Sequence, residues 1–358
     1  MTGLGDAVIG RVDAELAAFV DRRARALAPA GPDLQPLLDA AREFLLSGGK
    51  RLRPTFAYWG WRTVRDETDD DRGLITAAAS LELLHACALV HDDVMDASAT
   101  RRGRPAAHAA FAAAHRVAGW PGDPDSYGTA AAIVLGDLLL SWADALFASA
   151  HLDERFAAHP RTVFDDMREL VMAGQFLDVF VQARGQFRAA DALRVIEFKT
   201  SKYTIEGPLH FGAAIAGAPP EVFSTLSAYG LPLGEAFQLR DDLLGVFGDP
   251  SATGKPAGDD LREGKQTLLT ALALQAATSG QAAVLRGRLG DRTLDAAGVS
   301  ELREIIVATG ALAEVERRIT ERACAARAAL TGPAAHALNA PARTALDTLA
   351  GAAAHRAA

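Results

Sequence analysis

Hydrophobic residues recur along most of the chain with the spacing of amphipathic helices. Between residues 7 and 27 the apolar side chains fall on one stripe, formed by Val8, Val12, Leu16, Phe19 and Val20. This spacing matches the period of about 3.6 residues of an α-helix. The same period predicts helices over residues 34–46, 74–95, 129–147, 162–181, 221–247 and 301–330. Alanine, the strongest helix former, fills many positions between, and no run of alternating Val, Ile and Thr predicts a sheet. The expected fold class is all-α.

Glycine and proline stand mostly between the predicted helices, as at residues 48–49, 119–124, 217–220 and 248–258. None of these segments is long and polar enough to act as a flexible linker between domains. A length of 358 residues would ordinarily suggest roughly two domains. The continuous helical pattern instead predicts a single domain over 1–358, a large helical bundle whose last residues, 351–358, are expected to fray.

The charge balance and the few cysteines narrow the class of protein. The chain has 37 Lys plus Arg against 45 Asp plus Glu, a net charge of −8, and this acidic balance excludes a general nucleic-acid partner. Cys87 and Cys324 are too few for a disulfide framework, which favours a reducing cytoplasm. The most apolar stretch, GTAAAIVLGDLLLSW, is interrupted by Asp137, so no transmembrane segment is predicted. The first residues show no signal peptide.

Two acidic clusters lie in strongly apolar helical stretches. In the first, Asp92 and Asp96 are four residues apart and share a helix face, with Asp93 beside them. The second is the pair Asp241 and Asp242. Carboxylates so close repel one another unless a cation is present, and oxygen-only ligands suit Mg²⁺. A solvated acidic helix end explains one such cluster equally well, but a second pair within an apolar helix favours metal binding.

Basic residues follow a selective pattern. Lysine occurs only at five positions: Lys50, Lys199, Lys202, Lys255 and Lys265. Because lysine is a compact, flexible point charge and arginine a planar fork, the two are not equivalent phosphate ligands. Lys50 lies in the segment GGKRLRP (48–54), and a further basic run, RRGRP (101–105), follows the first acidic cluster. Chance survival at the surface explains any single lysine, but the set favours phosphate binding.

These segments together resemble the trans-isoprenyl diphosphate synthases, the polyprenyl synthetase family. The matching pieces occur in family order from about residue 47 to 267: GGKRLRP (48–54), LHACALVHDDVMD (84–96), RRGRP (101–105), Lys199-Thr200, FQLRDD (237–242), and Gly254-Lys255 through Asp259-Asp260 to Lys265. The resemblance implies an all-α bundle around a deep central cavity, usually in a homodimer. One departure is Gly245, where the family often has the third Asp of its second cluster; Asp249 follows beyond the predicted helix end.

The resemblance also implies the reaction and the role of each site residue. The family joins an allylic diphosphate (dimethylallyl, geranyl or farnesyl) to isopentenyl diphosphate and releases diphosphate, with about three Mg²⁺ ions in each active site. The implied metal ligands are Asp92, Asp93, Asp96, Asp241 and Asp242. The implied ligands of the allylic diphosphate are Arg101, Lys199, Lys255 and Lys265, with Thr200 and Gln238 near the reacting end. The implied ligands of isopentenyl diphosphate are Lys50, Arg53, His85 and Arg102. The five carboxylates with Arg101 and Lys199 form the expected catalytic set, and His91 is expected to be structural.

The product is predicted from the residues one turn before Asp92. In the family, bulky aromatic residues there stop growth at fifteen carbons, whereas this chain has the small Cys87 and Ala88 and lacks the two-residue insertion of many farnesyl-producing members. Both features favour the twenty-carbon geranylgeranyl diphosphate, with Trp142 as a possible floor or, alternatively, an ordinary core residue. Farnesyl or longer-chain synthases remain alternatives. More distant ones are a class I terpene cyclase, which lacks the GGKRLRP segment, and a non-catalytic synthase subunit, which usually loses its Asp clusters.

Overall fold

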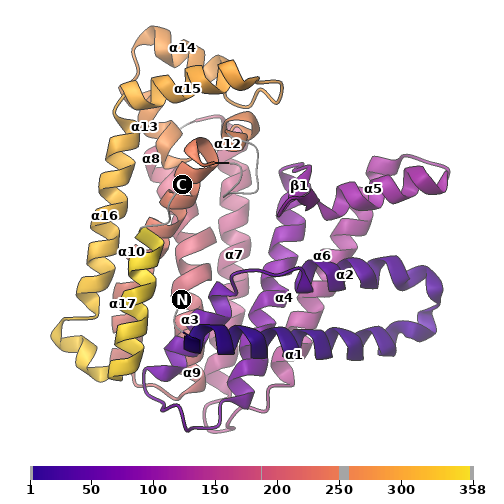
Figure 1. The fold of residues 1–358 in the computed structure, drawn as a ribbon, viewed down its shortest axis with the longest axis vertical. Coiled ribbons are helices and arrows are strands. Elements are labelled where there is room, and N and C mark those ends of the chain that lie inside the picture. Colours follow the sequence, from indigo (N-terminus) through magenta and orange to yellow (C-terminus); the bar gives the residue numbers. More distant parts are fainter. Residues whose placement is uncertain (1–2, 187, 250–257, 355–358) are drawn as a thin grey trace. The chain divides into compact units, whose positions relative to one another are not determined.

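The computed structural model describes residues 3–186, 188–249 and 258–354, and these are almost entirely helical (Figure 1). The predicted all-α class is confirmed. Contacts divide the chain into two compact units, one formed by residues 1–164 and 208–219 and the other by residues 165–207 and 220–358. The single domain over 1–358 stays a prediction. The last helix continues through Ala354, and residues 355–358 of the predicted tail lie outside the described part.

The first unit is built around two long apolar helices that pack along each other, α4 and α6. Its elements are α1 (Gly3–Leu27), η1 (Ala28–Ala30), η2 (Pro32–Leu34), α2 (Gln35–Leu46), α3 (Leu52–Arg62), α4 (Arg72–Met95), β1 (Thr100–Arg101), β2 (Arg104–Pro105), α5 (Ala107–Ala118), α6 (Pro124–Ala148), the start of α7 (Ala158–Arg184) and α9 (Gly207–Ile215). The α1 stripe predicted from the sequence is buried, as its period required. At α6, Asp123 caps the first turn by accepting a hydrogen bond from the Ser126 N–H, and Pro124 opens the helix.

Glycines allow α3 and α9 to approach within the first unit. A Cβ on Gly60 would lie 2.1 Å from the carbonyl oxygen of Leu209, and one on Gly212 would lie 1.8 Å from that of Ala57. Both distances are far below van der Waals contact, so only glycine fits at these crossings. The close approach fixes α3, which begins directly after the GGKR segment, against the rest of its unit.

The prediction that the chain has no sheet is wrong in one place. Thr100–Arg101 and Arg104–Pro105 form a two-stranded antiparallel hairpin, with Arg102 and Gly103 in the left-handed conformation at its turn. Strands of two residues are too short to produce an alternating pattern, so they could not be recognised from the sequence. The hairpin directs the basic run 101–105 back toward the end of α4.

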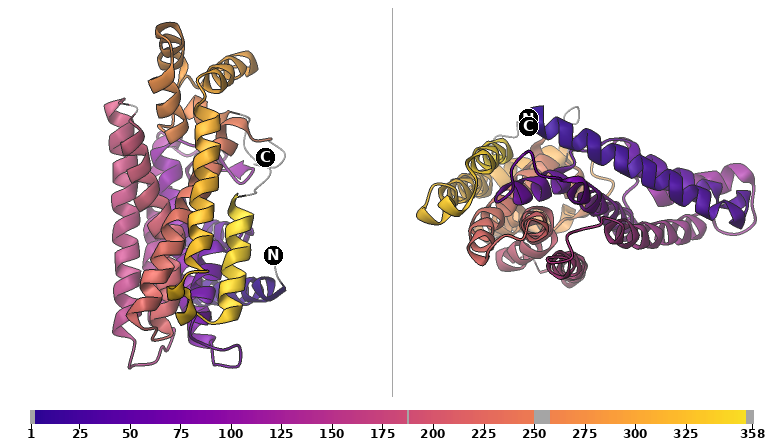
Figure 2. Two further views of the ribbon diagram at one scale, coloured as in Figure 1. Left: turned by 90° about the vertical axis from the view of Figure 1, so that its left-hand side faces the viewer. Right: turned by 90° about the horizontal axis from the view of Figure 1, so that it is seen from below.

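The second unit contains three long helices, α7, α10 and α16. Its elements are most of α7, α8 (Ala189–Val195), the π-helix η3 (Ile196–Glu206), α10 (Pro220–Phe247), α12 (Asp259–Glu263), α13 (Leu268–Ala276), α14 (Ser279–Arg288), α15 (Ala296–Ala308), α16 (Ala311–Ala329), η4 (Pro333–Ala337) and α17 (Ala340–Ala354). Helix α10 packs against η3, α16 and α17, and α16 and α17 lie side by side in the left view of Figure 2. The apolar residues of α10, α13, α15 and α16 form one buried core.

The single helix predicted over residues 301–330 is wrong, because the structure has two. Helix α15 ends at Ala308 and α16 begins at Ala311, with Gly310 between them at a φ of 77°. Glycine adopts this left-handed conformation without steric cost, so it ends one helix and permits the chain to change direction. The apolar period continues through the break and conceals it in the sequence.

Two helices of the described part are long and apolar enough to cross a membrane by length and composition, α4 and α6. The sequence predicted no such segment. The apolar window of α4 is 72% buried and that of α6 is 44% buried. Core helices of water-soluble proteins also have this composition, so these two helices are weak evidence for a membrane span.

Candidate functional site

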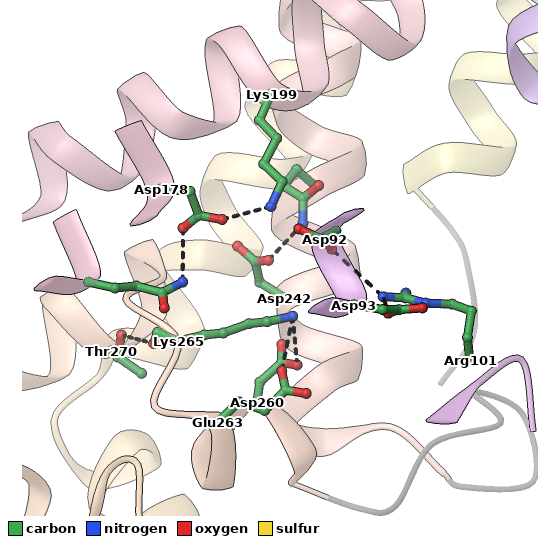
Figure 3. A network of polar contacts seen from close by, with 12 residues as sticks. Asp92, Asp93, Arg101, Asp178, Lys199, Asp242, Asp260, Glu263, Lys265 and Thr270 are labelled. Carbon is green, nitrogen blue, oxygen red and sulfur yellow. Dashed lines mark hydrogen bonds and ion pairs between the residues drawn. The ribbon is translucent and has the colours of Figure 1, made fainter. Parts of the chain in front are cut away.

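The first acidic cluster lies at the C-terminal end of α4 and is already paired with a cation. Asp93 is fully buried, and Arg101 on β1 donates hydrogen bonds to its Oδ1 from Nε, at 2.9 Å, and from a terminal nitrogen (Figure 3). Arg101 also lies 3.7 Å from Asp92. Asp96 follows as the residue that caps the end of α4. The structure therefore brings Arg101 to two of the three carboxylates that the sequence singled out, Asp92 and Asp93.

A group of arginines surrounds His85, which lies two turns before Asp92 on α4. Loss of solvent around the ring, and then the charges of Arg53, Arg102, Arg101 and Arg51, hold the pKa of His85 well below its ordinary value. His85 is therefore neutral at physiological pH and can donate a hydrogen bond without adding charge. Its role as a diphosphate ligand stays a prediction.

The glycine pair before Lys50 lets two of these arginines come close to the chain. The carbonyl of Gly48 accepts a hydrogen bond of 2.7 Å from Arg102. A Cβ on Gly49 would lie 3.3 Å from Arg51 and 3.4 Å from Arg102. Lys50 itself is exposed. Of the predicted isopentenyl diphosphate ligands, Lys50 thus lies in the segment before α3, Arg53 in the first turn of α3, His85 on α4 and Arg102 at the turn of the hairpin.

A buried ion pair stabilises the segment that leads into α3. Arg51 has a left-handed backbone (φ 46°) and donates from all three guanidinium nitrogens: to Glu82 at 2.8 Å, to Asp13 at 2.7 Å and to the carbonyl of Leu45 at 2.6 Å. The side chains of Arg51 and Glu82 are only 3% and 5% exposed. Burial opposes the charge of Arg51, but the charges and hydrogen bonds of Glu82 and Asp13 together outweigh it and raise the pKa of Arg51. The pair fixes the start of α3 to α1 and α4.

In the second unit, a chain of hydrogen bonds links the predicted reacting-end residues to the second acidic cluster. The Thr200 hydroxyl donates to Gln238 at 2.7 Å, and the Gln238 amide donates to Asp242 at 2.9 Å. Gln238 and Asp242 are four residues apart on α10 and so share a face. Gln238 lies opposite Thr200 of the π-helix. Thr200 and Asp242 are both buried, and the side-chain amide of Gln238 connects them.

Lys199 is held by a carboxylate that the sequence did not single out. Its ammonium group lies 2.7 Å from Asp178 of α7 (Figure 3). A Cβ on Gly174 would lie 2.5 Å from the backbone nitrogen of Lys199, so glycine lets α7 approach the π-helix closely. π-Helices are rare and occur frequently at functional sites. Here the π-helix presents Lys199 and Thr200 next to each other.

Lys265 also lies among carboxylates. Its Nζ is 3.4 Å from Asp260 and 3.4 Å from Glu263, both on α12 (Figure 3). Lys255, predicted to bind the same diphosphate, lies outside the described residues. Asp249, the first acidic residue after Gly245, is exposed beyond the end of α10. The acidic side chain that approaches the second cluster comes instead from α12.

Asp242 is strongly perturbed by this environment. Burial, and then the negative charges of Asp260 and Asp241, raise its pKa to about 7, although the Gln238 hydrogen bond acts in the opposite direction. In the first unit, burial raises the pKa of Asp93 despite Arg101, and its second oxygen has no hydrogen-bond partner. Buried carboxylates in this condition fit a hard divalent cation. As they stand, no three His, Cys, Asp or Glu side chains of the described part converge on one point.

The residues predicted to control product length all lie in the first unit. Ala88 shares the α4 face of Asp92, four residues away. Cys87 is buried on a different face, where its sulfur lies 3.8 Å from His91, and burial together with Asp137 raises its pKa to about 12. His91 contacts the carbonyl of Ile133 at 3.2 Å. Trp142 is buried and packs edge-on against Phe19 of α1; its role as a floor stays a prediction.

Sequence reasoning missed two carboxylates that the structure brings to basic residues: Glu82 pairs with Arg51, and Asp178 with Lys199. Both lie in apolar helical stretches, which is the one signal the sequence offered. Asp260 stands within the recognised segment that ends at Lys265, where it was given no role of its own, and it pairs with Lys265. A cavity of about 490 Å³ elsewhere in the second unit is lined by residues such as Arg188 and Arg286, and no predicted site residue lines it.

Comparisons with known proteins identify the family of the chain. A profile of the polyprenyl synthetase family matches residues 35–306. The geranylgeranyl pyrophosphate synthase of Corynebacterium glutamicum, solved with isoprenyl diphosphate and magnesium, is 39% identical, with a TM-score of 0.92 over 97% of this chain and 98% of that one. The geranylfarnesyl diphosphate synthase of Aeropyrum pernix is 33% identical over 79% of this chain and 83% of its own. The geranylgeranyl diphosphate synthase of Saccharolobus solfataricus is 31% identical over 76% and 77%.

The fold and these matches define an all-helical prenyltransferase. The chain belongs to the polyprenyl synthetase family, within which it is a trans-isoprenyl diphosphate synthase.

Proposed function

We propose that this enzyme condenses isopentenyl diphosphate head-to-tail with an allylic diphosphate, in the presence of Mg²⁺, and that its main product is geranylgeranyl diphosphate. The observation that carries the choice of product is the pair of small residues, Cys87 and Ala88, at the turn before Asp92. Ala88 lies on the Asp92 face of α4, so it leaves space beside the first acidic cluster. Relatives that make the same product support the choice.

The residues of the chain bind and orient the two diphosphates. Lys50, Arg53, Arg102 and neutral His85 hold isopentenyl diphosphate; Arg101, Lys199, Lys255 and Lys265 hold the allylic diphosphate, and Thr200 and Gln238 lie near the reacting carbon. The allylic carbon–oxygen bond breaks with its electron pair on the diphosphate, the isopentenyl double bond forms the new carbon–carbon bond, and a proton passes to the released diphosphate.

The carboxylates that fit Mg²⁺ are Asp92, Asp93, Asp96, Asp241 and Asp242. All five offer oxygen ligands, and the buried Asp93 and Asp242 are under-compensated by their protein partners. When bound, Mg²⁺ would neutralise the charge that grows on the departing diphosphate. We expect about three ions, the number implied by the family.

The direct test is chromatography of the products that the purified chain makes from isopentenyl diphosphate, each allylic diphosphate and Mg²⁺. Geranylgeranyl diphosphate should dominate. Ala88→Phe places a ring on the Asp92 face and should shift output to farnesyl diphosphate, with a smaller shift for Cys87→Phe. The matched controls, Cys87→Ser and Ala88→Ser, stay small and should leave the product unchanged. An unaltered product from both aromatic variants would show that the growing chain does not pass these residues.

The same chromatogram separates the alternatives. A fifteen-carbon or twenty-five-carbon diphosphate as the main product would refute the proposed length but keep the reaction. A hydrocarbon would indicate a terpene cyclase, and no turnover by the chain alone would indicate a non-catalytic subunit. Retention of both carboxylate clusters and of the arginine-ringed His85 argues against the last two.

We further propose that the enzyme is a homodimer that uses the apolar surface of α5 and α6. Val117 is 89% exposed and Val134 is 54% exposed, with Trp120 and Ile133 also at the surface. Exposed apolar groups gathered on neighbouring helices are typical of interfaces. Val134→Glu should convert the dimer to monomers in light scattering, whereas Val307→Glu, at a 52% exposed position of α15, should not. A Val134→Glu protein that stays dimeric would exclude this face.

We expect the enzyme to act in the cytoplasm. Both cysteines are free thiols in the structure, Cys87 buried and Cys324 exposed, as a reducing compartment allows.

A further inference from the structure

Helix α10 has no side chain at position 245, beside the second acidic cluster, and a side chain of α12 occupies that space. Gly245 follows Asp241 and Asp242 by four and three residues on α10, so a side chain at position 245 would share their face. In the structure the carboxyl group of Asp260 takes that space. A Cβ built on Gly245 would lie 2.0 Å from Oδ2 of Asp260 and 2.4 Å from its Cγ. No side chain at 245 is compatible with Asp260 in this position.

The space beside Gly245 is lined by carboxylates, and the ammonium group of Lys265 lies close to them. Asp260 is buried, although it is a charged residue. The Lys265 ammonium lies 3.4 Å from Oδ1 of Asp260 and 3.4 Å from Glu263. These separations are longer than good N–H···O hydrogen bonds, so the ammonium is attracted mainly by charge. The charge of Lys265 also acts on Asp242 of α10, so this lysine interacts with carboxylates of two elements, α10 and α12.

We propose that Asp260 supplies the third carboxylate of the Asp241–Asp242 cluster and binds a divalent cation there, in the space that Gly245 leaves open. The inference rests on the proposed function, which assigns Asp241 and Asp242 to Mg²⁺. Since no three acidic side chains of the described residues converge as they stand, the Asp260 and Asp242 side chains would turn toward the bound cation, whose charge would offset their repulsion. Oxygen-only ligands of this kind select Mg²⁺ or Mn²⁺.

The test is the affinity of the full-length protein for Mn²⁺, measured by electron paramagnetic resonance in the presence of inorganic diphosphate. Asp260→Asn keeps the shape of the side chain and should weaken the tightest Mn²⁺ site at least about tenfold. Asp249→Asn removes an equally acidic but exposed carboxylate beyond the end of α10. This control should bind Mn²⁺ as the unmodified protein does.

A transfer of the carboxylate tests the geometry itself. Gly245→Asp alone places a side chain against Asp260 and should lower the thermal midpoint of unfolding. Gly245→Asp combined with Asp260→Gly moves the carboxylate from α12 to α10, which removes the clash. The double variant should bind Mn²⁺ within about threefold of the unmodified protein. A double variant that folds but binds no better than Asp260→Asn would overturn the inference.

Two further measurements separate the inference from its assumptions. If Asp242→Asn weakens Mn²⁺ binding and Asp260→Asn does not, the inference is wrong and the proposed metal cluster stands. If neither weakens it, the assignment of the cluster in the proposed function is also wrong. Diphosphate binding in EDTA tests whether Asp260 only positions Lys265: equal losses with and without metal would refute a ligand role, and a loss confined to the metal-containing sample would support it.

Discussion

The buried pair of Arg51 and Glu82 gives a prediction whose size follows from its burial. An exposed ion pair contributes little to stability, but these side chains are 3% and 5% exposed and hold each other at 2.8 Å. Removing Arg51 leaves the Glu82 charge buried, so Arg51→Met should lower the free energy of unfolding by about 3–5 kcal/mol. Glu82→Leu should cost less, because Arg51 keeps its ion pair with Asp13.

The double variant Arg51→Met/Glu82→Leu should regain most of that loss, because apolar side chains of similar volume replace the pair without leaving a charge. Tryptophan fluorescence during urea unfolding is a local assay, since the 4 tryptophans of the chain all precede residue 165 and so report the first unit. Glu314→Ala, which breaks an exposed pair with Arg317, is the control and should change the urea midpoint little. Single variants as stable as the parent, or a double variant whose loss equals the sum of the two single losses, would refute the reasoning.

Three further predictions follow from other parts of the two units. The pKa of Asp242 is raised from 3.8 to about 7. The stability that its protonated form contributes is therefore present below pH 4 and is lost as the pH rises through 7, by up to about 4 kcal/mol. In the absence of metal, Asp242→Asn should unfold at a higher urea concentration than the parent at pH 8, and at the same concentration at pH 4. Lys50→Ala should raise the KM of isopentenyl diphosphate roughly a hundredfold, Lys265→Ala that of the allylic substrate, and equal effects on both would contradict the assignment. Gly212→Ala should cost more than about 2 kcal/mol of stability, measured by the same fluorescence; a neutral result would show that α3 and α9 separate easily.

Local patterns predicted most of the helices and the chemical type of the site. The stripe of Val8, Val12 and Leu16 is buried in α1, because an apolar period directly specifies which face of a helix packs. The acidic and basic motifs were recognisable because each is contiguous in sequence. What the pattern could not show is a change in the backbone itself. Gly310 ends a helix without interrupting the apolar period, and the π-helix has the same residues that an α-helix would accept.

The ion-pair partners of the site residues could not be predicted from the sequence either. Asp178 meets Lys199 from 21 residues away, and Glu82 meets Arg51 from 31. Nothing in the spacing of these residues requires the contact, since it depends on how separate helices pack. Asp260 illustrates the point most clearly. Its neighbour Asp259 is equally acidic, and only the structure shows which of the two carboxylates reaches Gly245.

The π-helix over Ile196–Glu206 makes the site sensitive to the deletion of a single residue. Its hydrogen bonds reach one residue further than those of an α-helix, so the segment holds extra backbone compared with regular winding. Losing one residue there would let the segment rewind as a regular α-helix, with its helical content nearly intact. Lys199 and Thr200 would then turn about the helix axis relative to α7 and α10, away from Asp178 and Gln238. Substitutions within this segment change one side chain, whereas a single deletion would misdirect several at once.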